Sequence, residues 1–238
     1  MDLEQSLANG KIDVAASDMF RVIMMQNKGK NIKFLASSCR EWQLFVNKKR
    51  RITKAEQLGD RMIGMTRCSV LDYYRDTISS KIKRNSGLLL KPQINDIFIR
   101  QQMLDEAQID AAFIPLPHNQ VSIQKGHNII NSLPYYDGYA GFAINTKRIA
   151  PDSPEINLLL KAYNMAIDSI KANPKREIPQ EILSHFKLDT ISLQMIKSKS
   201  LSHIYRPNKK TIESALYWSK KNHFASTVYK TDTLIYAH

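Results

Sequence analysis

The chain has 238 residues, 43% of them hydrophobic, with eight glycines and nine prolines, a composition typical of a globular protein rather than a disordered one. No apolar run approaches the roughly 20 residues that a membrane-spanning helix requires. The net charge of +13 suits an anionic ligand, but the basic residues are dispersed. The densest basic cluster, NKKRR at 47–51, is interpreted as a solvated loop, so nucleic-acid binding is not expected.

Strands and helices alternate over the first 115 residues. Asn9 and Gly10 stop the first helix, and Asp18 stands where an N-cap would open the second. Helices are predicted at 3–8, 19–27, 54–58, 69–81 and 97–106, and strands at 12–17, 32–37, 42–47, 61–65, 91–94 and 109–114. This alternation predicts an α/β protein with largely parallel sheets.

The pattern changes after Pro134. A strand is predicted at 138–145, and helices at 153–171, 179–186 and 209–221 make the C-terminal part mostly helical. The final YKTDTLIYAH fits neither a helix nor a strand clearly. The two cysteines, Cys39 and Cys68, form no CxxC motif and are expected to be free thiols.

A weak internal repeat suggests two similar lobes. LANGKIDVAASD at 7–18 and LDEAQIDAAFIP at 104–115 share the pattern L-x4-I-D-x-A, and both lie where a helix turns into a buried strand. The second copy is preceded by a further strand and helix, whereas only 11 residues precede Ile12. The first lobe is therefore expected to be incomplete, as in a chain truncated at its N-terminus.

A tight polar turn at 66–69 is the first candidate binding site. Thr66, Arg67, Cys68 and Ser69 follow a strand and open a helix. In an open α/β sheet, ligands bind beyond the carboxyl ends of the strands, and a helix N-terminus favours an anion. Alternatively, Ser69 simply caps its own helix and Arg67 points into water.

The same geometry recurs at Ser17 and Asp18. Asp18 either caps the following helix or accepts a hydrogen bond from a ligand. Trp42 is either a stacking platform for a ligand or part of the core. Asn95 and Pro115, which follow two further strands, complete the set of candidate ligand-binding residues.

Three segments resemble the substrate-binding proteins of ABC transporters, in the branch of sulfonate, taurine and nitrate binders and thiamine-pyrimidine-precursor proteins. GKIDVAASD is similar to the family's G-x-I-D-x-A strand, ITKAEQLGDRMIGMTRCS to its I-x4-D-L-x-G-K-x-I-G-x3-G-S run, and QIDAAFIPLP to its G-x-I-D-A-x4-E-P segment. The resemblance covers residues 7–149 and, more loosely, the rest. Cys68 stands where the family has glycine, and its acid–proline pair corresponds to Leu116–Pro117 or Ile114–Pro115.

The resemblance implies a type II periplasmic-binding-protein fold. Lobe 1 would comprise residues 1–50 and 150–238, lobe 2 residues 51–149, and the ligand would lie in the cleft between them. The chain would be the monomeric solute-binding component of an ABC importer, passing a small anionic or heterocyclic ligand to a membrane permease and its ATPase. It would act in the periplasm or anchored at the cell surface as a lipoprotein, although MDLEQSLANGKID has no signal-peptide pattern.

Two alternatives share this fold: an enzyme resembling thiamine-pyrimidine synthases, which use a histidine-rich centre and iron, and a ligand-sensing domain without a transport role. None of the six histidines lie three or four residues apart, so no metal motif is present in the sequence. Neither GxSxG nor a P-loop occurs. The sequence therefore predicts a binding protein and not an enzyme, without a cofactor or metal.

Overall fold

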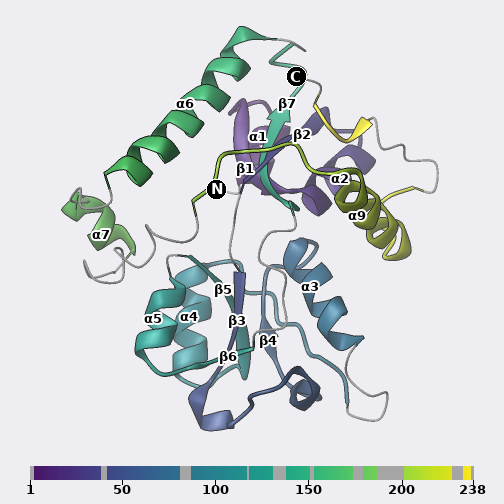
Figure 1. The fold of residues 1–238 in the computed structure, drawn as a ribbon. Helices are drawn as coiled ribbons and strands as arrows, with labels where there is room; N and C mark the ends of the chain where they lie inside the picture. Colours follow the sequence, from purple (N-terminus) through teal and green to yellow (C-terminus); the bar gives the residue numbers. More distant parts are fainter. Residues whose placement is uncertain are drawn as a thin grey trace.

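Two β-sheets form the centres of two α/β lobes, which lie one above the other in Figure 1. The computed structural model describes residues 3–38, 42–80, 87–116, 118–130, 138–150, 153–173, 179–186, 201–226 and 233–236. The strands are β1 (Val14–Asp18), β2 (Ile32–Ser37), β3 (Trp42–Val46), β4 (Ile63–Gly64), β5 (Ala111–Pro115), β6 (Asn128–Ile130) and β7 (Ala140–Asn145). The helices are α1 (Leu3–Ala8), α2 (Met19–Asn27), the 3₁₀ helices η1 (Lys48–Arg50) and η2 (Ala55–Leu58), α3 (Val70–Ser79), α4 (Ile97–Asp105), α5 (Asn119–Gln124), α6 (Pro154–Ala172), α7 (Gln180–Phe186) and α9 (Lys209–Lys221).

Strand direction differs from the prediction of largely parallel sheets. The upper sheet has the order β1-β7-β2 and the lower one β4-β5-β3-β6. β7 is antiparallel to both of its neighbours, as is β3, and among the named strands only β4 and β5 pair in parallel. The reason is that the chain enters β3 and β7 from the opposite lobe. These two strands therefore run away from the cavity side of their sheets, whereas β1, β2, β4 and β5 run toward it.

These two crossing strands also depart from the predicted domain boundaries. β3 lies in the lower sheet, although residues 1–50 were assigned to lobe 1, and β7 lies in the upper sheet, although residues 51–149 were assigned to lobe 2. The chain therefore passes between the lobes before β3 and before β7. The remaining extent of each domain stays a prediction.

The two copies of the internal repeat make the same hydrogen-bonded contact with an asparagine. Asn145, at the end of β7, donates from Nδ2 to the Leu7 carbonyl at 2.8 Å, and Asn47, just after β3, donates from Nδ2 to the Leu104 carbonyl. Each Oδ1 accepts from the backbone N–H two residues further on, at 3.0 and 2.9 Å. Both asparagines are buried. The equivalent leucines of the two repeat copies thus anchor the crossing strands in the same way.

Helices α6 and α9 of the C-terminal part contact the upper lobe. α9 lies against α2, and Ile156 and Leu160 of α6 pack in a small core with residues of β2 and β7. Within the ambiguous C-terminal segment, the described residues 233–236 lie along β2: Phe34 donates its N–H to the Leu234 carbonyl at 2.8 Å, and Tyr236 donates its N–H to the Phe34 carbonyl at 2.9 Å. Among the described residues, no helix combines the length and apolarity that crossing a bilayer takes.

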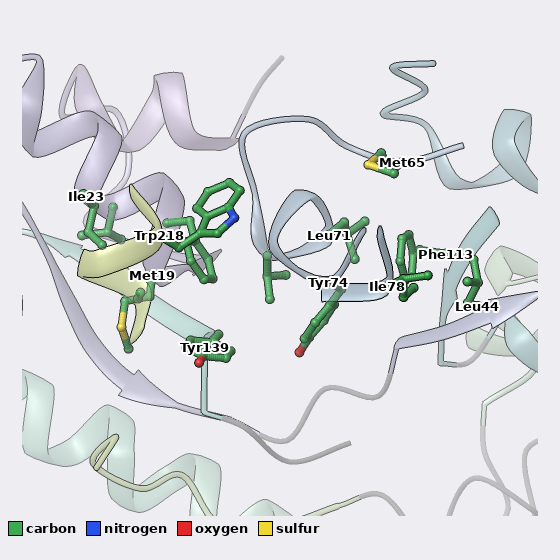
Figure 2. Close-up of a cluster of buried hydrophobic side chains, with 14 of the residues drawn as sticks. Met19, Ile23, Leu44, Met65, Leu71, Tyr74, Ile78, Phe113, Tyr139 and Trp218 are labelled. Atoms are coloured by element: carbon green, nitrogen blue, oxygen red, sulfur yellow. The ribbon is translucent and has the colours of Figure 1, made fainter. Parts of the chain in front are cut away.

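An aromatic cluster joins the two lobes. Tyr73 of α3 stacks on Phe20 of α2, with ring centroids 5.1 Å apart, and meets Tyr139, just before β7, at 4.9 Å. Trp218 of α9 packs edge-on against Phe20 and donates its indole N–H to Asp76 Oδ2 at 2.9 Å. Figure 2 shows Trp218 and Tyr139 in one buried cluster with side chains from α3.

Candidate ligand-binding site

A cavity of about 160 Å³ lies between the lobes, where β1 and β4 reach their carboxyl ends and helices α2 and α3 begin. Both lobes contribute side chains to it, as expected for a ligand held between them. The upper lobe supplies Glu4, Ala16, Ser17, Asp18, Arg21 and Ala140, and the lower lobe supplies Trp42, Thr66, Ser69, Val70 and Leu71.

The upper wall carries both signs of charge. Asp18 caps α2 by accepting from the Arg21 N–H at 3.1 Å. The Arg21 side chain forms an ion pair with Glu4, and only 16% of each side chain is exposed. Ser17 donates its hydroxyl to Glu4 Oε1 at 3.4 Å. This wall therefore places two carboxylates and one guanidinium group at the cavity, and Glu4 and Arg21 already pair with each other.

The lower wall is the polar turn that precedes α3. Ser69 caps the helix by accepting from the Leu71 N–H at 3.2 Å, and its hydroxyl donates to the Thr66 carbonyl at 2.6 Å. The Cys68 N–H donates to Asp72 Oδ2 at 2.7 Å. Ser69 thus fulfils the capping role of the simpler interpretation and also lines the cavity.

A buried arginine lies behind this wall. Arg100, on α4, is 2% exposed and donates to the carbonyls of Ile94 at 3.0 Å and Phe113 at 2.8 Å. Its Nη2 also donates to Thr66 Oγ1 at 2.9 Å. Burial lowers the pKa of Arg100 to about 10, against the opposing effect of Asp96, so the guanidinium remains charged at neutral pH.

Five of the nine predicted site residues line the cavity: Ser17, Asp18, Trp42, Thr66 and Ser69. Four are not part of its lining: Arg67, Cys68, Asn95 and Pro115. Arg67 and Asn95 are exposed, so Arg67 follows the alternative in which it points into water. Trp42 both lines the cavity and packs against the core. The role of these residues in binding stays a prediction.

A larger hollow of about 520 Å³ lies on the lower lobe, between α4 and α5. Phe98 and His118 line it, with their rings 4.8 Å apart, edge to face. Burial lowers the pKa of His118, with a smaller contribution from His185. Because the described residues that line this hollow all come from α4, α5 and their flanks, closure of the lobes is not expected to enclose a ligand there. The smaller cavity is therefore the candidate site.

The described part of the chain contains no group of three or more histidine, cysteine, aspartate or glutamate side chains placed to hold a metal ion. Cys68 is a free thiol, while Cys39 lies outside the described residues.

The arrangement of two lobes around a shared cavity is that of a periplasmic binding protein. No protein-family model and no curated protein sequence matches the chain. Among solved structures, the alkanesulfonate-binding protein SsuA from Xanthomonas axonopodis pv. citri, bound to MOPS, superposes with a TM-score of 0.78 at 10% identity, over 99% of this chain and 84% of that one. The periplasmic aliphatic sulphonate binding protein SsuA from Escherichia coli gives a TM-score of 0.71 at 12% identity, over 96% and 77%.

A third structure is described as the ligand-binding component of an ABC-type import system from Staphylococcus aureus, with zinc bound. It gives a TM-score of 0.68 at 14% identity, over 99% of this chain and 82% of that one. The chain thus has the two-lobed α/β fold of the SsuA-like substrate-binding proteins of ABC transporters, which confirms the expected fold. At these identities the likeness establishes the fold and leaves the ligand open.

Proposed function

We propose that the chain is the solute-binding component of an ABC importer, which holds a small ligand between its lobes and passes it to a membrane permease and its ATPase. The observation that carries this proposal is the shared cavity: strand ends and helix N-termini of both lobes meet there. The structural neighbours are described as binding proteins, in keeping with a role without catalysis.

The shape of the site supports capture by closure. Ser17 and Asp18 lie on one lobe and Thr66 and Ser69 on the other, so relative motion of the lobes would admit and enclose a ligand. Enclosure would remove water and strengthen every polar contact with the ligand. In this role the protein would work outside the cytoplasmic membrane, beside its permease.

The ligand is proposed to be small. The cavity of about 160 Å³ is well below the roughly 300 Å³ at which pockets for drug-sized molecules begin. The helix N-termini and lining hydroxyls suit an anionic group, while the Trp42 ring suits a heterocycle. Short sulfonates, small inorganic anions and aminopyrimidines are therefore the compounds to test.

A thermal-shift screen of taurine, alkyl sulfonates, nitrate, phosphate and aminopyrimidines tests the proposal. We expect a concentration-dependent rise in melting temperature for one class, because a ligand that binds only the folded state stabilises it. Ala16→Leu places a bulky side chain in the cavity and should abolish the rise. Ala162→Leu makes the same change on the exposed face of α6 and should leave it intact.

Two results would contradict the proposal. One is the absence of a shift with every compound although the protein is folded. The other is a shift that Ala16→Leu leaves unchanged, because binding would then occur outside the cavity.

A further inference from the structure

The hydrogen bond between Arg100 and Thr66 determines that the Thr66 hydroxyl, which lines the cavity, acts as an acceptor toward Arg100. A guanidinium group has N–H donors and no acceptor, so Thr66 Oγ1 must accept from Arg100 Nη2 at 2.9 Å. A hydroxyl that accepts in this way keeps its own hydrogen for a different partner. Thr66 is half-buried and lines the cavity, where a ligand would be such a partner.

Among the described residues, the other two side-chain hydroxyls that line the cavity already donate to protein groups. Ser69 donates to the Thr66 carbonyl at 2.6 Å, and Ser17 donates to Glu4 Oε1 at 3.4 Å. Within the described residues, no hydrogen bond from the Thr66 hydroxyl proton is recorded. Of the described hydroxyls that line the cavity, Thr66 is thus the one left to donate to a ligand.

We propose that Arg100 is a positioning residue, which acts through Thr66 to make the lower wall of the cavity a binding site for an oxyanionic group of the ligand. This inference rests on the proposed function. The anion would bind at the lower wall, and buried Arg100 would orient the Thr66 hydroxyl toward it. The positive end of the α3 helix dipole lies at the same wall, because α3 begins at Val70, which also lines the cavity.

The simpler alternative is that Arg100 only holds the fold together. Its side chain ties the Ile94 carbonyl, the middle of β5 at Phe113 and the turn at Thr66 into one network. Such a role would affect stability without a specific link between Arg100, Thr66 and a bound anion. Coupling between the two residues in anion binding is therefore the property that separates the two roles.

A double-mutant cycle with methanesulfonate, measured by calorimetry at constant ionic strength, tests this coupling. Thr66→Val keeps the shape but removes the hydroxyl, and should raise Kd about tenfold or more, whereas Thr66→Ser should bind like the wild type. Arg100→Lys should also raise Kd, because an ammonium group cannot make the three contacts of the planar guanidinium. In the Thr66→Val background, Arg100→Lys should have no further effect.

If Arg100→Lys does not fold, a second measurement tests the coupling with the wild type and Thr66→Val alone. The guanidinium ¹⁵N resonances of Arg100 should shift when methanesulfonate is added to the wild type, and Thr66→Val should abolish that shift. Additive effects on Kd, or unchanged binding by Thr66→Val, would overturn the inference. Binding of aminopyrimidines without any oxyanion would overturn it while the proposed function stands. No binding by any compound would overturn both.

Discussion

Cys68 adopts a left-handed backbone conformation in the turn before α3, with φ of 55°. The Cβ of an L-residue crowds the following carbonyl in this region, and glycine avoids that contact. The binding-protein sequence pattern that this segment resembles has glycine at the position of Cys68. The structural consequence of cysteine at this position is therefore a local backbone strain, and Cys68 is not part of the cavity lining.

Cys68→Gly should stabilise the protein. Relief of the left-handed strain contributes about 1–2 kcal/mol, and the greater flexibility of glycine in the unfolded chain offsets about 0.5–1 kcal/mol of this. Chemical denaturation should therefore show a free energy of unfolding higher by about 0.5–1 kcal/mol. Cys68→Ala should bring no such gain, while Ala107→Gly, at φ of 61° after α4, should match it. Equal stability of the glycine and alanine variants at position 68 would contradict this explanation.

The strand-end rule explains which site residues could be predicted. Ser17, Asp18, Thr66 and Ser69 all follow or end a strand, and all line the cavity. Glu4 and Arg21 were missed because they lie on helices, where charged residues usually face solvent.

Arg100 was missed for the same reason, since nothing in the sequence of α4 distinguishes a buried arginine from an exposed one. Only its contacts with three separate segments reveal it. To predict such a buried arginine from the sequence, one would need to know which face of each helix packs against the sheet.

At the scale of elements, Gly141 allows β7 to fit between β1 and β2. It pairs with Ser17 on one side and Ser37 on the other, beside an irregularity in the register of β2. A Cβ at this position would overlap the Ala36 carbonyl oxygen and approach Ser37 Cα to 2.9 Å. The close approach is to backbone atoms, which cannot move aside as a flexible side chain would.

Gly141→Ala should therefore destabilise the upper sheet by about 3 kcal/mol or more, since overpacking a strand against backbone forces the sheet to shift. Gly29→Ala offers a control, because no atom lies within 4 Å of its added Cβ. It should cost only the strain of its left-handed backbone, about 1–2 kcal/mol. Urea denaturation of both variants measures the loss in free energy of unfolding. A loss at position 141 no larger than that at position 29 would show that β7 shifts to accommodate the added Cβ.

Elements with strong patterns were predicted well. The bounds of α2 and α9 match their prediction, because a capping residue and an amphipathic repeat mark each one. The prediction missed α5, with the sequence NQVSIQ, and β6, with only three residues, since both are too short to show a period. Strand direction was wrong because local sequence does not say from which lobe a strand arrives.

At the scale of the whole molecule, the contact of Trp218 with Asp76 connects a helix of the upper lobe to a helix of the lower one. Together with Phe20, Tyr73 and Tyr139, it buries aromatic surface that would separate if the lobes moved apart. The lobes are thus held together in part by the protein itself. We therefore expect this cluster to oppose separation of the lobes even without a ligand.

Trp218→Phe retains an aromatic ring but removes the hydrogen bond to Asp76. We expect the free energy of unfolding to fall by about 1–2 kcal/mol, and the radius of gyration of the unliganded protein, measured by small-angle scattering, to rise. Tyr217→Phe, beside it on α9 but 71% exposed, should change neither quantity. Unchanged dimensions in Trp218→Phe would mean that the cluster does not restrain the lobes.

The crossing strands also impose an order on folding. The lower sheet is assembled from a continuous stretch of chain, from β3 to β6, and can form as soon as that stretch has been synthesised. The upper sheet cannot, because its central strand, β7, is made about 100 residues after β2, and until it arrives β1 and β2 have no strand between them. A nascent chain would therefore carry a folded lower lobe beside an unfinished upper one, whose exposed strand edges would be the natural target of a chaperone.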